Sequence, residues 1–492
     1  MTDITNLEPE LLWKHFEEIR KVPRASKHEE RIREYITNFA IGHNLVYKSD
    51  KVGNIVISKP ATSGLESKPT VVLQSHMDMV CEKNADKAHD FSKDPLSFKM
   101  DGDWLKADGT TLGADNGIGL CASLAILESG DVKHGPIEAL FTIDEETGLT
   151  GAFALSNDML KGRLMLNLDS EELGAIYVGC AGGGDSSIRL PLKREAPEGS
   201  PVRVAVKGLR GGHSGVDIHE QRGNAIKLLA RLLWDSATRH DFALADIKGG
   251  NLRNAIPREA EAVVFAANPD PMMNDLMTEA NAIQAELQKV DPDFRLEVSA
   301  LKPGEAPKAV LDAGSSLKVI GLLNGLPHGV LAMSLDIPGL VETSCNLAVV
   351  GIEPAQGGTG DGSGGEVLKV QMSSRSSIGT RLRQSRDTIK SIAVMTGADV
   401  QEGDAYPGWK PNLDSPLLKT VAGVYQNMLG KEPARKAIHA GLETGVIGER
   451  FPGMDMVSIG PDIKYPHSPD ERVSIPSVAT FYKAVLKVLE SV

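Results

Sequence analysis

The first candidate for chemistry is a histidine that follows an apolar run and precedes an aspartate by two residues. Val71 to Leu73 are expected to form a buried strand, and His76 and Asp78 lie where that strand ends. Side chains two residues apart in an extended chain point to the same side. A metal-binding histidine usually needs such a partner to fix its tautomer, although a purely structural His–Asp pair would have the same spacing. The pair is therefore a candidate for metal binding or catalysis.

Two further aspartates occupy similar junctions. Asp115 precedes a helix expected over residues 120–128, where its alternative role is that of an N-cap. Asp169 follows an apolar strand expected over residues 163–168. Ligands of open α/β sheets collect at the carboxyl ends of the strands. Repeated placement of carboxylates at such ends therefore indicates one shared site more strongly than any single residue does.

Three adjacent carboxylates, Asp144, Glu145 and Glu146, end the strand expected over residues 136–143. Neighbouring carboxylates at the end of a buried strand repel one another unless cations or protons compensate. A charged turn is the alternative, but a strand this apolar favours a site. The two glutamates should point in different directions, so that one can bind a metal while the other faces the reacting group.

His467 stands in a loop between two prolines, where a role in the core is not expected. Together with His76, Asp115, Glu146 and Asp169 it gives a set of two imidazoles and three carboxylates. A catalytic zinc ion usually takes only three protein ligands and a water, so this set is too large for one ion. It fits two ions about 3.5–4 Å apart that share one carboxylate.

The elements that must position these residues belong to an α/β protein interrupted by an insertion. Residues 1–200 combine helical spacing with short apolar strands, and residues 401–492 return to the same style. Residues 201–400 show a βαβ pattern twice. We therefore predict a domain with a mixed sheet flanked by helices, formed by both ends of the chain, and an inserted α/β domain of two similar lobes.

Composition restricts the class of protein. The chain has 492 residues and a formal net charge of −13, which argues against nucleic acid as the main partner. No apolar run is long enough to span a membrane, and the acidic N-terminal residues do not form a signal peptide. The four cysteines are widely spaced and lack a C-x-x-C motif. These features predict a cytoplasmic protein with reduced thiols.

A glycine-rich stretch over residues 357–365 suggests a phosphate-binding loop at first sight. It lacks the Gly-Lys-Ser/Thr ending of such loops and is not followed by a helical pattern. We therefore predict a hairpin loop between two strands.

Taken together, six motifs resemble those of the M20 dinuclear zinc peptidases, in the same order and over nearly the whole chain. They are His76-Met77-Asp78, Gly113-Ala114-Asp115-Asn116-Gly117, Asp144-Glu145-Glu146-Thr147-Gly148, Asn167-Leu168-Asp169, Gly211-Gly212-His213-Ser214-Gly215 and Pro466-His467-Ser468. The Asp-Glu-Glu-Thr-Gly run, the doubled insertion and the segment Asn254-Ala255-Ile256-Pro257 are most similar to the aminoacyl-histidine dipeptidase branch, the cytosolic non-specific dipeptidases.

The resemblance implies two Zn²⁺ ions per subunit, for which Co²⁺ or Mn²⁺ can substitute. Asp115 would bridge the ions. His76 and Asp169 would complete one of them, while Glu146 and His467 would complete the other. Two residues would have catalytic roles without being ligands. Asp78 would orient His76, and Glu145 would take a proton from the metal-bridging water and pass it to the leaving amine.

The resemblance also assigns the inserted domain as a lid that closes over the substrate and forms a homodimer. His213 would stabilise the tetrahedral oxyanion, from its own or from the partner subunit. Asn254 and Arg375 would hold the C-terminal carboxylate of the substrate. His439 and Glu443 would bind the substrate near its free amine, or be ordinary polar loop residues. For the role of Arg375 the sequence offers three competitors, Arg253, Arg258 and Arg381.

The implied activity is the hydrolysis of Xaa-His dipeptides such as carnosine, and of other unblocked dipeptides. A tripeptidase or an N-acyl amino acid amidohydrolase would use the same chemistry. From a different class, a non-catalytic metal- or peptide-binding protein could share the fold, but it would have no need for a base at Glu145. An acidic scaffold protein would require the whole ligand set to be a coincidence.

Overall fold

The computed structural model describes residues 3–302, 304–355 and 365–492, which form two compact units. The first unit contains the chain up to residue 180 together with residues 409–437 and 442–492. The second unit contains residues 181–408 and 438–441. The hairpin loop predicted at residues 357–365 lies almost entirely outside the described residues.

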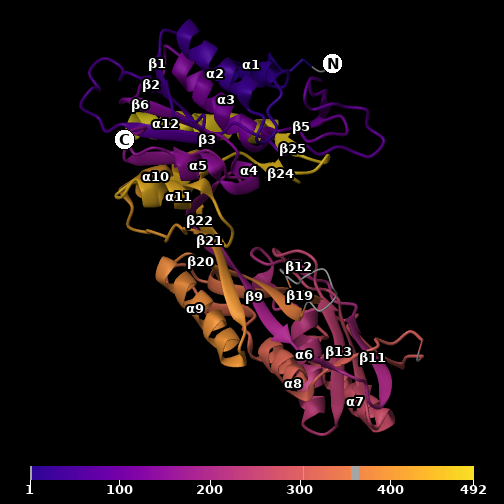
Figure 1. The fold of residues 1–492 in the computed structure, drawn as a ribbon. Coiled ribbons are helices and arrows are strands. Elements are labelled where there is room, and N and C mark those ends of the chain that lie inside the picture. The colour runs from indigo at the N-terminus through magenta and orange to yellow at the C-terminus, as the bar shows by residue number, and fades with distance from the viewer. Residues whose placement is uncertain (1–2, 303, 356–364) are drawn as a thin grey trace. The chain divides into compact units, whose positions relative to one another are not determined.

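The first unit is built on an eight-stranded mixed sheet with the strand order β1-β2-β6-β3-β7-β23-β8-β22 (Figure 1). Strand β3 is parallel to β6 and β7, and β7 is parallel to β23. Every residue of β3 and β6 is buried, as is usual for central parallel strands covered on both faces. The strands are β1 Val46–Ser49, β2 Ile55–Lys59, β3 Val71–His76, β6 Ile137–Thr142, β7 Leu164–Asn167, β8 Ala175–Cys180, β22 Ala434–Ile438 and β23 Asp455–Ser458.

Helices from both ends of the chain pack together in this unit. Helix α1 contacts α3, α3 contacts α12, and α12 contacts α10. Trp13 and Phe16 of α1 are almost completely buried, because apolar residues recur along one face of that helix. The longer helices are α1 Glu10–Ile19, α2 Glu30–Gly42, α3 Ala114–Glu128, α10 Pro416–Leu429, α11 Glu443–Arg450 and α12 Ile475–Ser491, and the short ones are α4 Glu145–Gly148 and α5 Thr150–Ala154.

A small four-stranded sheet completes the first unit, with the order β24-β25-β5-β4. It pairs β25 near the C-terminal end of the chain with β5, which lies shortly before α3. The loop that carries His467 is thereby tied to the segment that leads into Asp115. The strands are β4 Phe98–Asp101, β5 Trp104–Ala107, β24 Ile463–Lys464 and β25 Arg472–Ser474.

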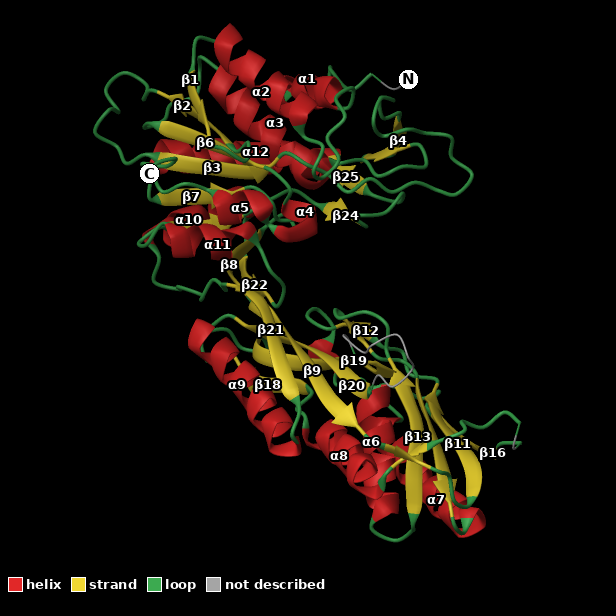
Figure 2. Ribbon diagram, in the orientation of Figure 1, coloured by secondary structure: helices red, strands yellow, loops and turns green. Residues whose placement is uncertain are grey.

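The second unit is built on one continuous nine-stranded sheet. Eight strands follow the order β16-β11-β15-β13-β19-β20-β9-β21, and β18 pairs with β19 (Figure 2). The strands are β9 Gly182–Leu192, β11 Ser200–Lys207, β13 Phe242–Gly249, β15 Ala260–Ala266, β16 Arg295–Ala300, β18 Gly329–Met333, β19 Val341–Pro354, β20 Glu366–Ser376 and β21 Asp399–Tyr406. The helices are α6 Ala225–Ala237, α7 Pro269–Leu287, α8 Ala313–Gly325 and α9 Gly379–Thr396.

Two halves of this sheet have the same βαββαβ connectivity. In the inner lobe the elements run β11, α6, β13, β15, α7, β16, and the strands lie in the order fourth, first, third, second. In the outer lobe they run β9, α8, β19, β20, α9, β21, with the same spatial order. This is the ferredoxin-like pattern. The inner lobe is inserted in the outer one after β9, and the two meet where β13 pairs with β19.

The second unit begins earlier and ends later than the predicted segment of residues 201–400. That segment leaves out β9 and most of β21, which pair with each other, and β9 also pairs with β20. Strand β9 starts with three glycines followed by polar residues, so it lacks the apolar run that predicts a strand.

The predicted fold class is confirmed at the level of a mixed α/β protein. Among the described residues, no helix combines the length and the apolar character that crossing a membrane requires.

Candidate metal centre

His76 is the last residue of β3, and its ring lies between carboxylates on both sides. Its Nδ1 atom is 3.2 Å from Asp78 Oδ1. Its Nε2 atom is 3.2 Å from Asp115 Oδ1 and 3.3 Å from Asp169 Oδ1. The imidazole is 1% exposed, so Asp78 holds one nitrogen while the other faces two acidic side chains.

Asp115 lies between the two histidines. Its Oδ1 atom faces His76, and its Oδ2 atom is 3.2 Å from His467 Nε2. Glu146 Oε2 is 3.0 Å from the same nitrogen of His467. The predicted N-cap alternative does not describe this aspartate, because the cap position of α3 is Gly113 and Asp115 has non-helical dihedral angles within the first turn.

The predicted ligands form two groups that share Asp115. One group consists of His76, Asp115 and Asp169, and the other of Asp115, Glu146 and His467. Within each group, one potential ligand atom from every residue lies within 4.8 Å of the others. The geometry therefore brings all five predicted ligands together around one shared carboxylate.

The electrostatics of the cluster are those of crowded buried carboxylates. Burial is the main cause that raises the pKa of Asp169 to about 7, with further contributions from Asp115 and Glu146. Hydrogen bonds with Asp115 and Glu146 raise the pKa of His467 to about 11. The shift of His467, and the part of the Asp169 shift that comes from neighbouring carboxylates, indicate a negative potential, which a bound divalent cation would neutralise.

The donor set fits hard or borderline divalent cations such as zinc. It offers imidazole nitrogen and carboxylate oxygen and no thiolate. Glu146 Oε1 is buried and has no hydrogen-bond partner among the described residues. A buried carboxylate oxygen without a donor is costly unless a cation or a proton compensates it.

Asp78 connects His76 to the turn that carries the two glutamates. Its carboxylate accepts hydrogen bonds from the main-chain N–H groups of Glu145, at 3.1 Å, and Glu146, at 3.3 Å. The Ser26 hydroxyl donates a further bond at 2.8 Å. Burial would raise the pKa of Asp78, but these bonds and His76 outweigh it and lower the pKa.

Glu145 begins α4 and lies beside the predicted ligands. It forms a further close group with His76 and Glu146. Burial first, and then the neighbouring carboxylates Asp169 and Glu146, raise the pKa of Glu145 well above its ordinary value. The side chain therefore lies next to the ligands, in surroundings that favour its protonated form.

A fourth group, made of carboxylates alone, was not predicted, and the structure gives it a structural role. Glu29 lies with Asp78 and Asp144 in a buried cluster. Its Oε1 atom accepts bonds from the N–H groups of Lys27, at 2.8 Å, and Asp144, at 3.0 Å. Asp144 in turn accepts a bond of 2.6 Å from the Thr147 hydroxyl. These hydrogen bonds hold the turn of the glutamates, and no spacing in the sequence signals Glu29.

His213, Arg375 and His439 lie together in the second unit. His213 Nδ1 accepts hydrogen bonds from the N–H groups of Gly215, at 3.2 Å, and Val216, at 3.0 Å. The neutral ring therefore carries its proton on Nε2, as an available donor. Burial first and Arg375 second lower the pKa of His213, and the same causes lower the pKa of His439 to about 3.

Arg375 and Asn254 complete the surroundings of this histidine. Arg375 Nη1 donates to the Tyr406 hydroxyl at 3.1 Å. The main-chain oxygen of Asn254 accepts a bond of 2.8 Å from the N–H of Ser214, next to His213. Tyr406 was not predicted as a site residue, because it lay at the start of the segment 401–492 that was assigned to the other domain. Of the competitors of Arg375, Arg253 forms an ion pair with Asp185 at 2.9 Å.

Glu443 lies in the first unit and is completely buried. It accepts hydrogen bonds of 2.6 Å each from Gln74 Nε2 and the Thr142 hydroxyl, and burial raises its pKa to about 8. His439 belongs to the second unit, where its Nε2 atom lies 2.7 Å from the Ser344 hydroxyl. The structure therefore does not group these two predicted substrate residues within one unit.

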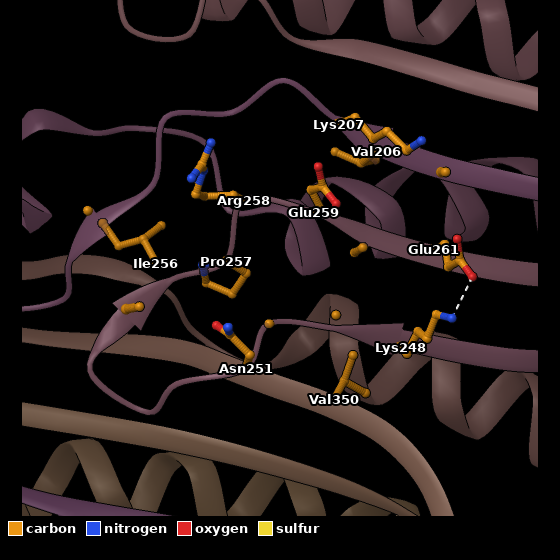
Figure 3. Close-up of a pocket in the computed structure, with 16 residues that line it drawn as sticks. Val206, Lys207, Lys248, Asn251, Ile256, Pro257, Arg258, Glu259, Glu261 and Val350 are labelled. Atoms are coloured by element: carbon orange, nitrogen blue, oxygen red, sulfur yellow. Dashed lines mark ion pairs between the residues drawn. The ribbon is translucent and has the colours of Figure 1, made fainter. Parts of the chain in front are cut away.

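An open pocket of about 610 Å³ lies on the sheet of the second unit (Figure 3). It is lined by residues of β11, β13 and β15 and by the segment around Asn251. Lys248 and Glu261 form an ion pair of 2.8 Å across it. Its charges are mixed, and it contains none of the predicted site residues.

Comparison with known proteins gives a consistent result. The sequence profile of peptidase family M20/M25/M40 matches residues 72–491. The cytosol non-specific dipeptidase of Escherichia coli (strain K12) is 42% identical over 496 residues, which cover 100% of this chain and 99% of that protein. The crystal structure of aminoacylhistidine dipeptidase from Vibrio alginolyticus is 42% identical, with a TM-score of 0.92 over 100% of this chain and 98% of that one. A tripeptidase from Staphylococcus aureus, 18% identical with a TM-score of 0.56 over 99% of this chain and 98% of that one, shares the fold.

Proposed function

Because the chain belongs to peptidase family M20/M25/M40 and is a metal-dependent dipeptidase of that family, we propose that it hydrolyses Xaa-His dipeptides such as carnosine, together with other unblocked dipeptides. The observation that carries the proposal is the pair of ligand groups that share Asp115. The names of the two relatives at 42% identity support the choice of substrate.

The proposed cofactor is two Zn²⁺ ions, for which Co²⁺ or Mn²⁺ can substitute. His76 and Asp169 would hold one ion, Glu146 and His467 the other, and Asp115 both. When bound, the ions supply Lewis-acid activation of water and of the scissile carbonyl.

The chain's own residues would then move the proton and orient the ligands. Asp78 fixes the ring of His76 through Nδ1. Glu145 accepts a proton from the attacking water and later donates it to the nitrogen of the leaving amino acid. Its place beside His76 and Glu146, on the turn anchored by Asp78, supports this role.

Residues of the second unit would bind the substrate. We propose that His213 donates its Nε2 proton to the developing oxyanion, and that Arg375 and Asn254 bind the C-terminal carboxylate of the dipeptide. The acceptor role of His213 Nδ1 supports the first assignment. The shared neighbourhood of Arg375 and His213 supports the second. His439 of this unit, and Glu443 of the first unit, are proposed to contribute to binding near the free amine.

A substrate panel tests the function. The reconstituted enzyme is assayed with carnosine, Ala-Ala, Ala-Ala-Ala and acetylated amino acids, each with zinc, cobalt and manganese. We expect turnover of carnosine and Ala-Ala. Turnover of the acetylated compounds alone would show an N-acyl amino acid amidohydrolase, and preference for Ala-Ala-Ala would show a tripeptidase. Stoichiometric metal binding without any hydrolysis would show a binding protein.

Arg375→Ala should raise KM for Ala-Ala roughly 10- to 100-fold, because a hydrogen bond to a charged group contributes about 1.5–3 kcal/mol. Steady-state kinetics measure this effect, and kcat should change less than KM. Arg381→Ala is the matched control, since its side chain is 55% exposed. An unchanged KM in Arg375→Ala, or an equal effect in the control, would refute the assignment of the carboxylate site.

We also propose that the protein forms a homodimer through the second unit. We propose a cytosolic location as well, which the name of the Escherichia coli relative states for that protein. Sedimentation equilibrium measures the assembly directly. At the protein concentration used in the activity assay, we expect a mass twice that of one chain. A monomer with full activity at that concentration would contradict the dimer.

A further inference from the structure

Four consecutive main-chain N–H groups converge on one carboxylate beside the metal centre. Glu471 Oε2 accepts from Leu112 at 2.7 Å and from Gly113 at 2.9 Å. Its Oε1 atom accepts from Ala114 at 2.8 Å and from Asp115 at 3.3 Å. Glu471 is 2% exposed and lies 356 residues away from Asp115 in the sequence. A distant glutamate thus binds the whole main chain that leads into the shared ligand.

Arg24 holds the same loop from its carbonyl side. Its guanidinium donates to the main-chain oxygen of Gly113, and its Nη1 atom donates to that of Asp78 at 2.9 Å. Gly113 has a φ of +70°, and a Cβ atom there would lie 2.5 Å from Arg24 Nη2. The loop before Asp115 is therefore fixed by a buried acceptor on one side and a buried donor on the other.

Glu471 also belongs to the segment that carries His467. Its own N–H donates to the main-chain oxygen of Ser468 at 3.0 Å, so the two residues share a turn. The next residue, Arg472, begins β25, which pairs with β5. The side chain of His467 is 49% exposed, and its φ is +59°. Packing around His467 is therefore sparse, and a left-handed backbone at a residue other than glycine needs support from its surroundings.

We propose that Glu471 is a positioning residue that sets the register between the two loops that supply Asp115 and His467. This inference rests on the proposed function, because it takes both residues as metal ligands. One carboxylate binds the N–H groups of the first loop while its backbone is part of the second. Loss of its acceptors should separate His467 from Asp115 while leaving His76, at the end of β3, and Asp169, just after β7, in place.

The test is the zinc affinity of Glu471→Gln compared with that of Asp470→Asn. The first change replaces one accepting oxygen by an NH₂ group that faces main-chain N–H donors. The second change removes the same charge from the adjacent, exposed residue. Each protein is dialysed against buffered free Zn²⁺ and its metal content is measured. Visible spectra of the Co²⁺ forms report the coordination of each site.

In Glu471→Gln we expect one of the two zinc equivalents to bind about 10- to 100-fold more weakly, as for other residues that orient ligands. The other equivalent should be unchanged, and excess Zn²⁺ should restore activity. Asp470→Asn should behave as the wild type. Two equivalents with wild-type affinity in Glu471→Gln, or equal weakening of both, would overturn the proposal.

The outcome also separates this inference from the proposed function. A wild-type protein that binds no zinc would refute the metal centre itself, whereas a normal wild type beside an unaffected variant would refute only the role of Glu471. If Glu471→Gln does not give folded protein, Glu471→Asp carries the comparison. It keeps the carboxylate but withdraws it by one methylene, so the same selective loss is expected, and its absence would again overturn the proposal.

Discussion

Glu145→Ala is expected to lower kcat about 10²- to 10⁴-fold, the contribution typical of a positioned general base. The zinc content should stay at the wild-type level, because the two ligand groups that share Asp115 do not need Glu145. Its place beside His76 and Glu146 supports this role, and burial and the nearby carboxylates raise its pKa. Activity and metal content are measured on the same preparation.

The control for this experiment is Glu172→Ala. The side chain of Glu172 is 42% exposed and forms an ion pair with Lys436 at 2.7 Å. Its loss should leave kcat unchanged. Hydrolysis by Glu145→Ala at the wild-type rate would refute the role of Glu145 as the base. Loss of zinc together with activity would instead show that Glu145 is a ligand.

Asp115→Ala should have the largest effect on metal binding, because it removes the one carboxylate that both ligand groups share. The loss of zinc affinity should exceed the roughly 10- to 100-fold that is typical for residues around the ligands. His76 and His467 would also lose the acidic partner that lies 3.2 Å from each of them. Dialysis against buffered Zn²⁺ followed by elemental analysis measures the change.

Asp108→Ala provides the comparison for that variant. Asp108 lies in the same region of the chain but forms ion pairs with Lys87 and Lys99. Hydrogen bonds from these lysines lower the pKa of Asp108 to about 2. Its removal should leave both zinc equivalents in place. Retention of two tightly bound zinc ions in Asp115→Ala would rule out a shared ligand at this position.

The sequence was most informative where a side chain follows a strongly apolar strand. His76 and Asp169 could be placed because β3 ends at His76 and β7 ends two residues before Asp169, and the ends of parallel strands meet at one edge of a sheet. His467 was grouped with them because a histidine between two prolines is not expected in the core, and its loop has no periodicity of its own. Its distance to Asp115 depends on tertiary contacts.

Contacts between distant loops could not be predicted from the sequence either, because they too depend on tertiary structure. Hydrophobic periodicity identifies local elements, but it does not say which N–H groups a single buried glutamate such as Glu471 or Glu29 will meet. Tyr406 belongs to β21, which pairs with β9. Because β9 begins with glycines, it was not predicted as a strand, and its pairing with the segment of Tyr406 could not be foreseen. Glu443 was expected near substrate, and its bonds to Gln74 and Thr142 required the fold to be known.

The insertion of one lobe in the other determines the order in which strands can pair during synthesis. All strands of the inner lobe lie between residues 200 and 300, so the pairings within that lobe can form once that stretch has left the ribosome, whereas its pairing with β19 comes later. Strand β9 emerges earlier but must wait for β20 and β21, and β7 must wait for β23. His467 and Glu471 come almost last. A nascent chain therefore carries a finished inner lobe well before its metal centre can close, and it exposes unpaired strand edges in the interval.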